Sequence, residues 1–179
     1  MVKDRYPREA VVSGFRILGE GQLSLQKFVF LTDRDIDLTD FRLVLETLLE
    51  RVDWRRDLFV VSEVAQDTLD YTGPKVNHGS KGMLLGLGEP VRALPERLPD
   101  TTPLPAGIVR AVPFCRGCLV VQGRAFAEAK NLVRDVARHA PFADWPLIVL
   151  VDDVDEATRS NELFLWTTFT RMEPAADIH

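Results

Sequence analysis

The sequence lacks the features that mark membrane proteins and nucleic-acid-binding proteins. No apolar run reaches the roughly 20 residues that a membrane-spanning helix needs. The opening MVKDRYPREA has no apolar core of the kind found in signal peptides. The 27 acidic residues outnumber the 22 basic ones, for a net charge of -5, and no basic stripe could follow a phosphate backbone. These absences predict a cytoplasmic protein with no membrane span and no nucleic-acid partner.

Cysteine and histidine are also scarce, with two and three residues respectively. Cys115 and Cys118 form a Cys-x-x-Cys pair, which is typical of a redox couple or of half a zinc site. No histidine stands at a spacing that would complete a tetrahedral site, and residues 119–121 read as a strand, whereas a thioredoxin-like pair would begin a helix. We expect two structural thiols at a strand edge, with a redox or metal role as the alternative.

The stretch GPKVNHGSKG resembles a phosphate-binding loop, but its spacing does not fit. A P-loop has four residues between its glycines, and its lysine is followed by serine or threonine. Here five residues separate Gly73 from Gly79, and Ser80 precedes Lys81. The pattern favours a tight loop whose glycines let the backbone pack closely against a neighbour. Lys75 and Lys81 could still meet an anion there.

An acidic series, Asp33, Asp35, Asp37 and Asp40, resembles a calcium-binding loop. An EF-hand needs glycine at its sixth position and glutamate at its twelfth, and here those positions hold leucine and valine. We expect these carboxylates to lie where the carboxyl end of a strand meets the amino terminus of a helix, which the helix dipole favours. A similar acidic cluster at residues 152–155 supports a structural role.

Residues 27–33, KFVFLTD, read as a strand that leads into an amphipathic helix. The helix is apolar at three- and four-residue steps between residues 41 and 52, and Thr39 or Asp40 could cap it. Residues 57–63 read as a second, buried parallel strand. Together they predict a βαβ unit with a right-handed crossover.

The same pattern returns near the end of the chain, where residues 147–179 align with residues 27–59 without a gap. Neither copy could bury its faces alone, so we predict that both contribute to a single sheet. The helix of the second copy is apolar nearly all round over residues 163–169, which predicts burial on several sides or a subunit interface. Matching pairs include Val29/Val149, Asp33/Asp153, Leu45/Leu165, Thr47/Thr167 and Arg51/Arg171.

These elements predict one α/β domain over residues 1–179, with a mostly parallel sheet flanked by helices. Six prolines within residues 73–107, between the two copies, predict an irregular excursion with at most short elements near residues 83–87. A strand over residues 118–121 and a helix from about residue 125 to 139 should follow. The segments are an entry helix and loop (1–26), the first βαβ unit (27–72), the excursion (73–107) and the second β/α unit (108–179).

Four segments carry a family resemblance: VKDRYPREA, GEGQLSLQKFVFLTDRDIDLTDF, TLDYTGPKVNHGSKG and FLWTTFTRMEPAADIH. In this order they resemble landmarks of the carboxyl-terminal part of the UbiD family of decarboxylases, over essentially the whole chain. That family uses prenylated FMN for the reversible decarboxylation of aromatic and unsaturated carboxylic acids. The resemblance implies that this chain is a C-terminal domain or small subunit of such an enzyme. A stand-alone binding or oligomerisation module that kept the fold is the alternative.

The resemblance also implies what the chain lacks. UbiD enzymes carry their catalytic glutamate and arginine network and their metal ligands upstream of the landmark VKDRYPREA, where this sequence begins. We therefore expect no catalytic residue and no metal site in this chain, and no activity when it is alone. Prenylated FMN would be bound only in the complete enzyme, together with a flavin-binding partner portion. The family's C-terminal region joins subunits, so a homo-oligomer is expected.

The same resemblance nominates residues for the wall of the substrate pocket. The segment EGQLSLQK resembles a stretch that approaches the flavin, which makes Gln22 a candidate cofactor contact and Leu25 and Lys27 candidate pocket residues. The segment DTLDY resembles another wall and nominates Leu69 and Tyr71. Apolar walls suit the reaction because a poorly hydrated carboxylate loses carbon dioxide more readily. Leu25 and Leu69 could instead be ordinary core, whereas a lysine beside an apolar strand must find a charge or water.

Overall fold

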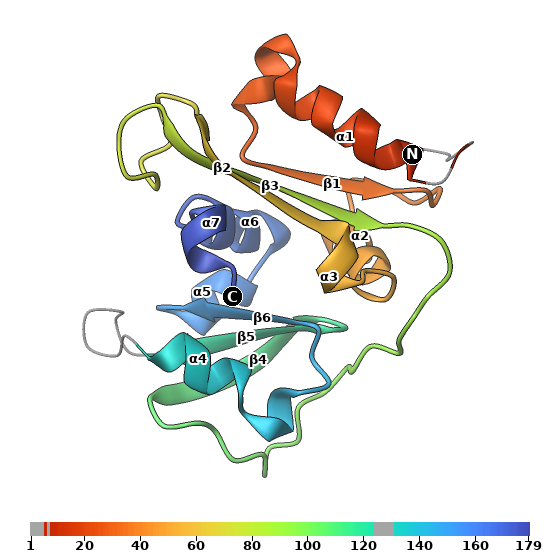
Figure 1. The fold of residues 1–179 in the computed structure, drawn as a ribbon. Helices are drawn as coiled ribbons and strands as arrows, with labels where there is room; N and C mark the ends of the chain where they lie inside the picture. Colours follow the sequence, from red (N-terminus) through yellow and green to blue (C-terminus); the bar gives the residue numbers. More distant parts are fainter. Residues whose placement is uncertain (1–5, 7, 124–130) are drawn as a thin grey trace.

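The structure, a computed structural model, describes residues 6, 8–123 and 131–179 and is built around two separate sheets (Figure 1). In the first three-stranded sheet the order is β1 (Phe28–Thr32), β3 (His78–Gly86) and β2 (Leu58–Ala65). Strand β3 runs parallel to β1 and antiparallel to β2. All of β3 after its first residue is buried, so it forms the centre of this sheet.

The second three-stranded sheet has the order β4 (Ile108–Cys115), β5 (Cys118–Gly123) and β6 (Leu147–Val151). Its central strand, β5, is antiparallel to β4 and parallel to β6. The two sheets therefore have the same plan, in which β1, β3 and β2 correspond to β6, β5 and β4. In each sheet a hairpin is completed by one parallel edge strand, but the edge strand precedes the hairpin in the first sheet and follows it in the second.

The prediction of a single, mostly parallel sheet is wrong. The strands form two separate sheets, and each sheet contains one parallel and one antiparallel pair. The predicted βαβ crossover is also wrong, since β3 lies between β1 and β2 and β2 is an exposed antiparallel edge strand. Both errors have one cause. The sequence HGSKGMLLG reads as part of a loop-rich excursion, whereas it forms the nine-residue central strand.

The helices in chain order are α1 (Glu9–Gly19), η1 (Gly21–Leu25), α2 (Phe41–Leu49), α3 (Trp54–Asp57), α4 (Leu132–Ala137), η2 (Ala140–Phe142), α5 (Val154–Thr158), α6 (Asn161–Phe169) and α7 (Pro174–Asp177). The amphipathic entry helix and the helix after the first strand are confirmed as α1 and α2. Of the helix expected over residues 125–139, α4 is the described part, and residues 124–130 lie outside the described residues. No described helix has the length and apolar character to span a membrane.

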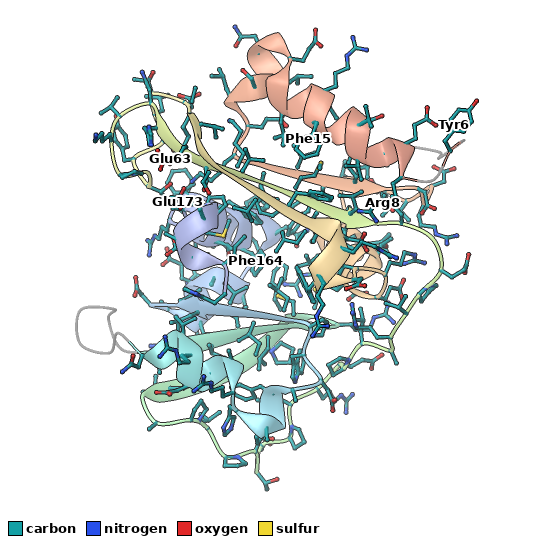
Figure 2. The ribbon with its side chains drawn as sticks, in the orientation of Figure 1. Tyr6, Arg8, Phe15, Glu63, Phe164 and Glu173 are labelled. Carbon is teal, nitrogen blue, oxygen red and sulfur yellow. The ribbon has the colours of Figure 1, made fainter. Side chains whose placement is uncertain are left out.

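Helices and sheets alternate in layers (Figure 1). Helix α1 packs on one face of the first sheet and α2 on the other. Helices α2, α5 and α6 also cover one face of the second sheet, and α4 covers its far face. Phe164 of α6 lies between the sheets (Figure 2) and stacks on Phe114 of β4, with the ring centroids 3.9 Å apart. Burial of such aromatic pairs holds the two sheets together through the helices between them.

The internal repeat seen in the sequence is present in three dimensions. Helices α2 and α3 correspond residue for residue to α6 and α7, at a spacing of 120 residues. Their caps correspond as well, because Asp40 accepts a hydrogen bond from the amide of Leu43 and Ser160 accepts one from the amide of Leu163. Both short helices that end the repeated units, α3 and α7, pack against the first sheet and contact β2 and β3.

Candidate functional site

The segments nominated for a pocket wall lie at one end of the first sheet, where β1 and β3 begin and β2 ends (Figure 1). Gln22 and Leu25 belong to η1, and Leu69 and Tyr71 belong to the loop between β2 and β3. All four side chains are exposed, with Leu69 77% and Tyr71 79% accessible. The interpretation of Leu25 and Leu69 as ordinary core is therefore wrong. Exposed apolar side chains of this kind can exclude water from a ligand or partner that lies against them.

Lys27 is placed differently from the other four, because its side chain is only 11% exposed and points into the protein. Its ammonium lies 2.7 Å from the carboxylate of Asp70 and donates to the hydroxyl of Thr72 at 3.0 Å. It also donates to the carbonyl oxygens of Phe169 and Met172, both at 2.9 Å. The lysine thus joins three segments: the start of β1, the β2–β3 loop and the carboxyl end of α6. The expectation that it must find a charge is met by Asp70.

Asp70 organises the β2–β3 loop from within. Its carboxylate accepts hydrogen bonds from the backbone amide and hydroxyl of Thr72 and from the side-chain amide of Gln66. Burial would raise the pKa of the Asp70 carboxyl, but the hydrogen bonds from Lys27 and Thr72 outweigh that effect and leave the pKa below its ordinary value. The loop is therefore held by a charged, hydrogen-bonded centre while Leu69 and Tyr71 face outward.

Two glycines permit the close packing of this loop. A Cβ atom on Gly73 would lie 2.0 Å from the carbonyl oxygen of His78, and one on Gly79 would lie 1.9 Å from the Oε1 atom of Gln66. Both distances are far below van der Waals contact, so neither position accepts a larger residue without rearrangement. The expected tight loop is thus present at Gly73, although strand β3 begins five residues later, at His78.

A second polar contact joins the end of the chain to the same end of the first sheet. Ser80 of β3 donates a hydrogen bond to the carboxylate of Glu173 and accepts one from the amide of Ala175. Glu173 also caps α7 by accepting from the amide of Ala176 at 2.7 Å. Both Ser80 and Glu173 are buried. Sequence reasoning missed Glu173, although an acidic residue directly before Pro174 is a typical helix-start signal.

A shallow cleft of about 350 Å³ opens beside this contact, between the end of β2 and α7. On its wall the Nε2 atom of His78 lies 2.8 Å from the Oε2 atom of Glu63. Glu63 lies at a register shift of β2 and has a φ of 57°, a left-handed conformation that a non-glycine residue rarely adopts. Figure 2 shows Glu63 and Glu173 at the same end of the first sheet.

The carboxylates of the two acidic clusters accept hydrogen bonds at the beginnings of turns and helices. Asp37 accepts hydrogen bonds from the amide and hydroxyl of Thr39, which lower the pKa of its carboxyl. Asp40 caps α2, and Asp153 caps α5 by accepting from the amide of Glu156. Within residues 6, 8–123 and 131–179, no three cysteine, histidine or acidic side chains are grouped so that they could hold a metal ion. The prediction that these carboxylates lie between the end of a strand and the start of a helix is confirmed.

Cys115 and Cys118 face each other across the turn between β4 and β5, and both are buried free thiols. Burial, followed by the neighbouring Cys115 sulfur, raises the pKa of the Cys118 thiol well above its ordinary value. Reactive cysteines need an accessible thiolate, so this setting favours the structural role at a strand edge over redox chemistry.

Residues 1–85 match the family model described as the 3-octaprenyl-4-hydroxybenzoate carboxy-lyase C-terminal domain. The matched region contains η1, Lys27, the β2–β3 loop and nearly all of β3. The second half of the chain, with the repeated unit, lies beyond this match. A UbiD-class enzyme, HmfF from Pelotomaculum thermopropionicum, solved in complex with FMN, overlaps 57% of this chain and 22% of its own, at 20% identity and a TM-score of 0.45.

Curated relatives match over the whole chain. A Chlamydia trachomatis serovar D protein described as uncharacterized is 48% identical over 180 residues. A Chlamydia pneumoniae protein described as a subunit of 4-hydroxybenzoate decarboxylase is 46% identical over 179 residues. The chain spans 30% of the length of each of these relatives. Residues 1–85 thus carry the C-terminal domain of the UbiD family, and the similarity to a decarboxylase subunit extends over the whole chain.

Proposed function

We propose that this chain is the C-terminal part, or a small subunit, of a UbiD-type decarboxylase that acts on aromatic or unsaturated carboxylic acids. In this proposal it contributes assembly contacts and pocket walls, while prenylated FMN and the proton-transfer groups belong to the flavin-binding portion. The observation that carries the proposal is the set of exposed apolar side chains, Leu25, Leu69 and Tyr71, on two segments that are held at one end of the first sheet.

The physical reason is that a wall must be both apolar and fixed. Lys27 and Asp70 hold the β2–β3 loop from inside, so Leu69 and Tyr71 can face a neighbouring flavin portion at little cost in ordering. Apolar contact there would keep water from the reacting carboxylate. Trp166, which is 62% exposed on α6, is a second candidate contact for the partner portion or for another copy of the chain.

The test is reconstitution with the flavin-bearing portion of a UbiD enzyme from the same source, loaded with prenylated FMN. Decarboxylation of an aromatic acid such as 4-hydroxybenzoate is expected with both components and not with this chain alone. Leu69→Asp should lower kcat/KM at least about tenfold, because it puts a charge on the wall. Leu38→Asp, at another exposed leucine, is the matched control and should change little. A chain that stays monomeric and inert with every such partner would favour a stand-alone binding module.

A further inference from the structure

A cleft of about 300 Å³ lies between α1 and β2, on the face of the first sheet that α1 covers only in part. Its walls are mainly apolar, with Phe15 and Leu18 from α1 facing Val61 and Val64 from β2. Figure 2 shows Phe15 on the side of α1 that faces the sheet. Among the described residues that line the cleft, Lys81 of β3 is the one with a charge. An apolar cleft with a single charged group is the usual composition of a small-molecule site.

Lys81 is 95% buried, since only 5% of the residue is accessible. Its ammonium donates to the carbonyl oxygens of Ser24 at 2.6 Å and Gln26 at 2.9 Å. An ammonium has three donors, so one N–H remains without an acceptor among the described residues. No described carboxylate forms an ion pair with it. Burial lowers the pKa of Lys81, and the attraction of the Asp70 and Asp67 carboxylates, which acts in the opposite direction, does not offset that effect.

A buried charge is usually paired with an opposite charge. The two carbonyl oxygens compensate only part of the cost of burying the Lys81 ammonium. The missing partner should carry one negative charge and should have an apolar body, because the rest of the wall offers no further cation. A phosphate dianion would leave most of its charge and its acceptors unmatched in such a cleft. A carboxylate on an aliphatic or aromatic body fits both the single ammonium and the apolar walls.

We propose that the cleft between α1 and β2 binds a small amphiphilic carboxylate, with the carboxylate on the Nζ atom of Lys81 and the apolar body between Phe15 and Val61. This site is assigned from the cleft and its lysine and does not rest on the proposed decarboxylase function. Binding should therefore occur in the chain by itself, without flavin and without a partner.

The test uses octanoate and its uncharged counterpart octanol, each titrated into the full chain by calorimetry and followed by amide NMR. Octanoate should bind at one site and shift signals from α1, β2 and Lys81. Octanol should bind at least about tenfold more weakly, because it lacks the charged hydrogen bond. Failure of octanoate to bind, or equal affinity for octanol, would overturn the proposal.

Two variants test the role of the Lys81 charge, one by deleting it and one by pairing it within the protein. Lys81→Met deletes the ammonium and keeps an apolar side chain of similar length. Val61→Glu places a carboxylate opposite the lysine, since Val61 is the cross-strand partner of Lys81 in the sheet. Each should weaken octanoate binding about tenfold or more, and Lys75→Met, at an exposed lysine of the β2–β3 loop, should leave it unchanged. If both folded variants bind octanoate as well as the original chain, Lys81 is not the anchor and the proposal fails.

Discussion

Lys27 and Lys81 are two lysines buried on the same sheet, and they differ in what their ammonium groups meet. Lys27 has a carboxylate at 2.7 Å and three further oxygen acceptors from two other segments. Lys81 has two carbonyl oxygens and a mainly apolar cleft beside it. The first lysine is saturated and ties segments together, whereas the second has only two acceptors and borders a cleft. Burial of a lysine therefore says little about its role until its acceptors are known.

Of the changes compared here, removal of the Lys27 ammonium should cause the largest loss of stability. Lys27→Met leaves the buried Asp70 carboxylate without its cation and frees the carbonyl oxygens at the end of α6. Removing one partner of a buried ion pair costs about 3–5 kcal/mol, and we expect a loss of that order in the free energy of unfolding by urea. Lys75→Met controls for the loss of a charge at an exposed site. A change below about 1 kcal/mol would show that Lys27 does not hold the loop.

The next effect concerns pH and the other partner, Asp70. Its carboxyl has a lowered pKa in the folded protein, so the unfolded chain takes up the proton first as the pH falls. The stability that this group contributes is present above the ordinary carboxyl pKa and is lost as the pH falls toward the folded value. Asp70→Asn should lower stability at neutral pH and flatten the decline between about pH 6 and pH 3. Unfolding curves for both proteins across that range measure the difference, and parallel declines would contradict the assignment.

The smallest effect should come from Lys81. Lys81→Met removes a charge that has no carboxylate partner, and replacing a buried ion by an apolar side chain of similar volume is often neutral or stabilising. We expect the free energy of unfolding without ligand to change by less than about 1 kcal/mol, or to rise. A loss as large as that of Lys27→Met would show that the two carbonyl contacts alone make Lys81 a structural residue, and would erase the contrast between the two lysines.

Local patterns predicted much of the secondary structure. Helices α1 and α2, the cap at Asp40 and the repeat that places α6 at a fixed spacing from α2 all follow from apolar periodicity and capping residues. Strand β3 did not follow, because its glycines and its lysine read as a loop. In the folded chain those glycines have a packing reason: a Cβ on Gly82 would collide with the ring of Phe28, and one on Gly86 with Leu48. Such a reason exists only after distant segments have come together.

The candidate site divides in the same way. Family resemblance nominated the exposed Leu25, Leu69 and Tyr71, and chemistry predicted that Lys27 needs a charge. No local pattern could pair Ser80 with Glu173, which lie 93 residues apart. Local patterns also could not show that Lys27 and Lys81 have different surroundings.

The sequence by itself determined helices α1, α2 and α6, the cap of α2, the repeated unit and the residue types available at the end of the first sheet, because these depend on neighbours within a few positions along the chain. Only the tertiary structure decided that the strands divide into two mixed sheets, that α7 returns to the first sheet, and that one buried lysine is saturated while the other faces a cleft. These outcomes depend on which distant groups compete for each hydrogen bond and each apolar face, and that competition is resolved only when the whole chain packs.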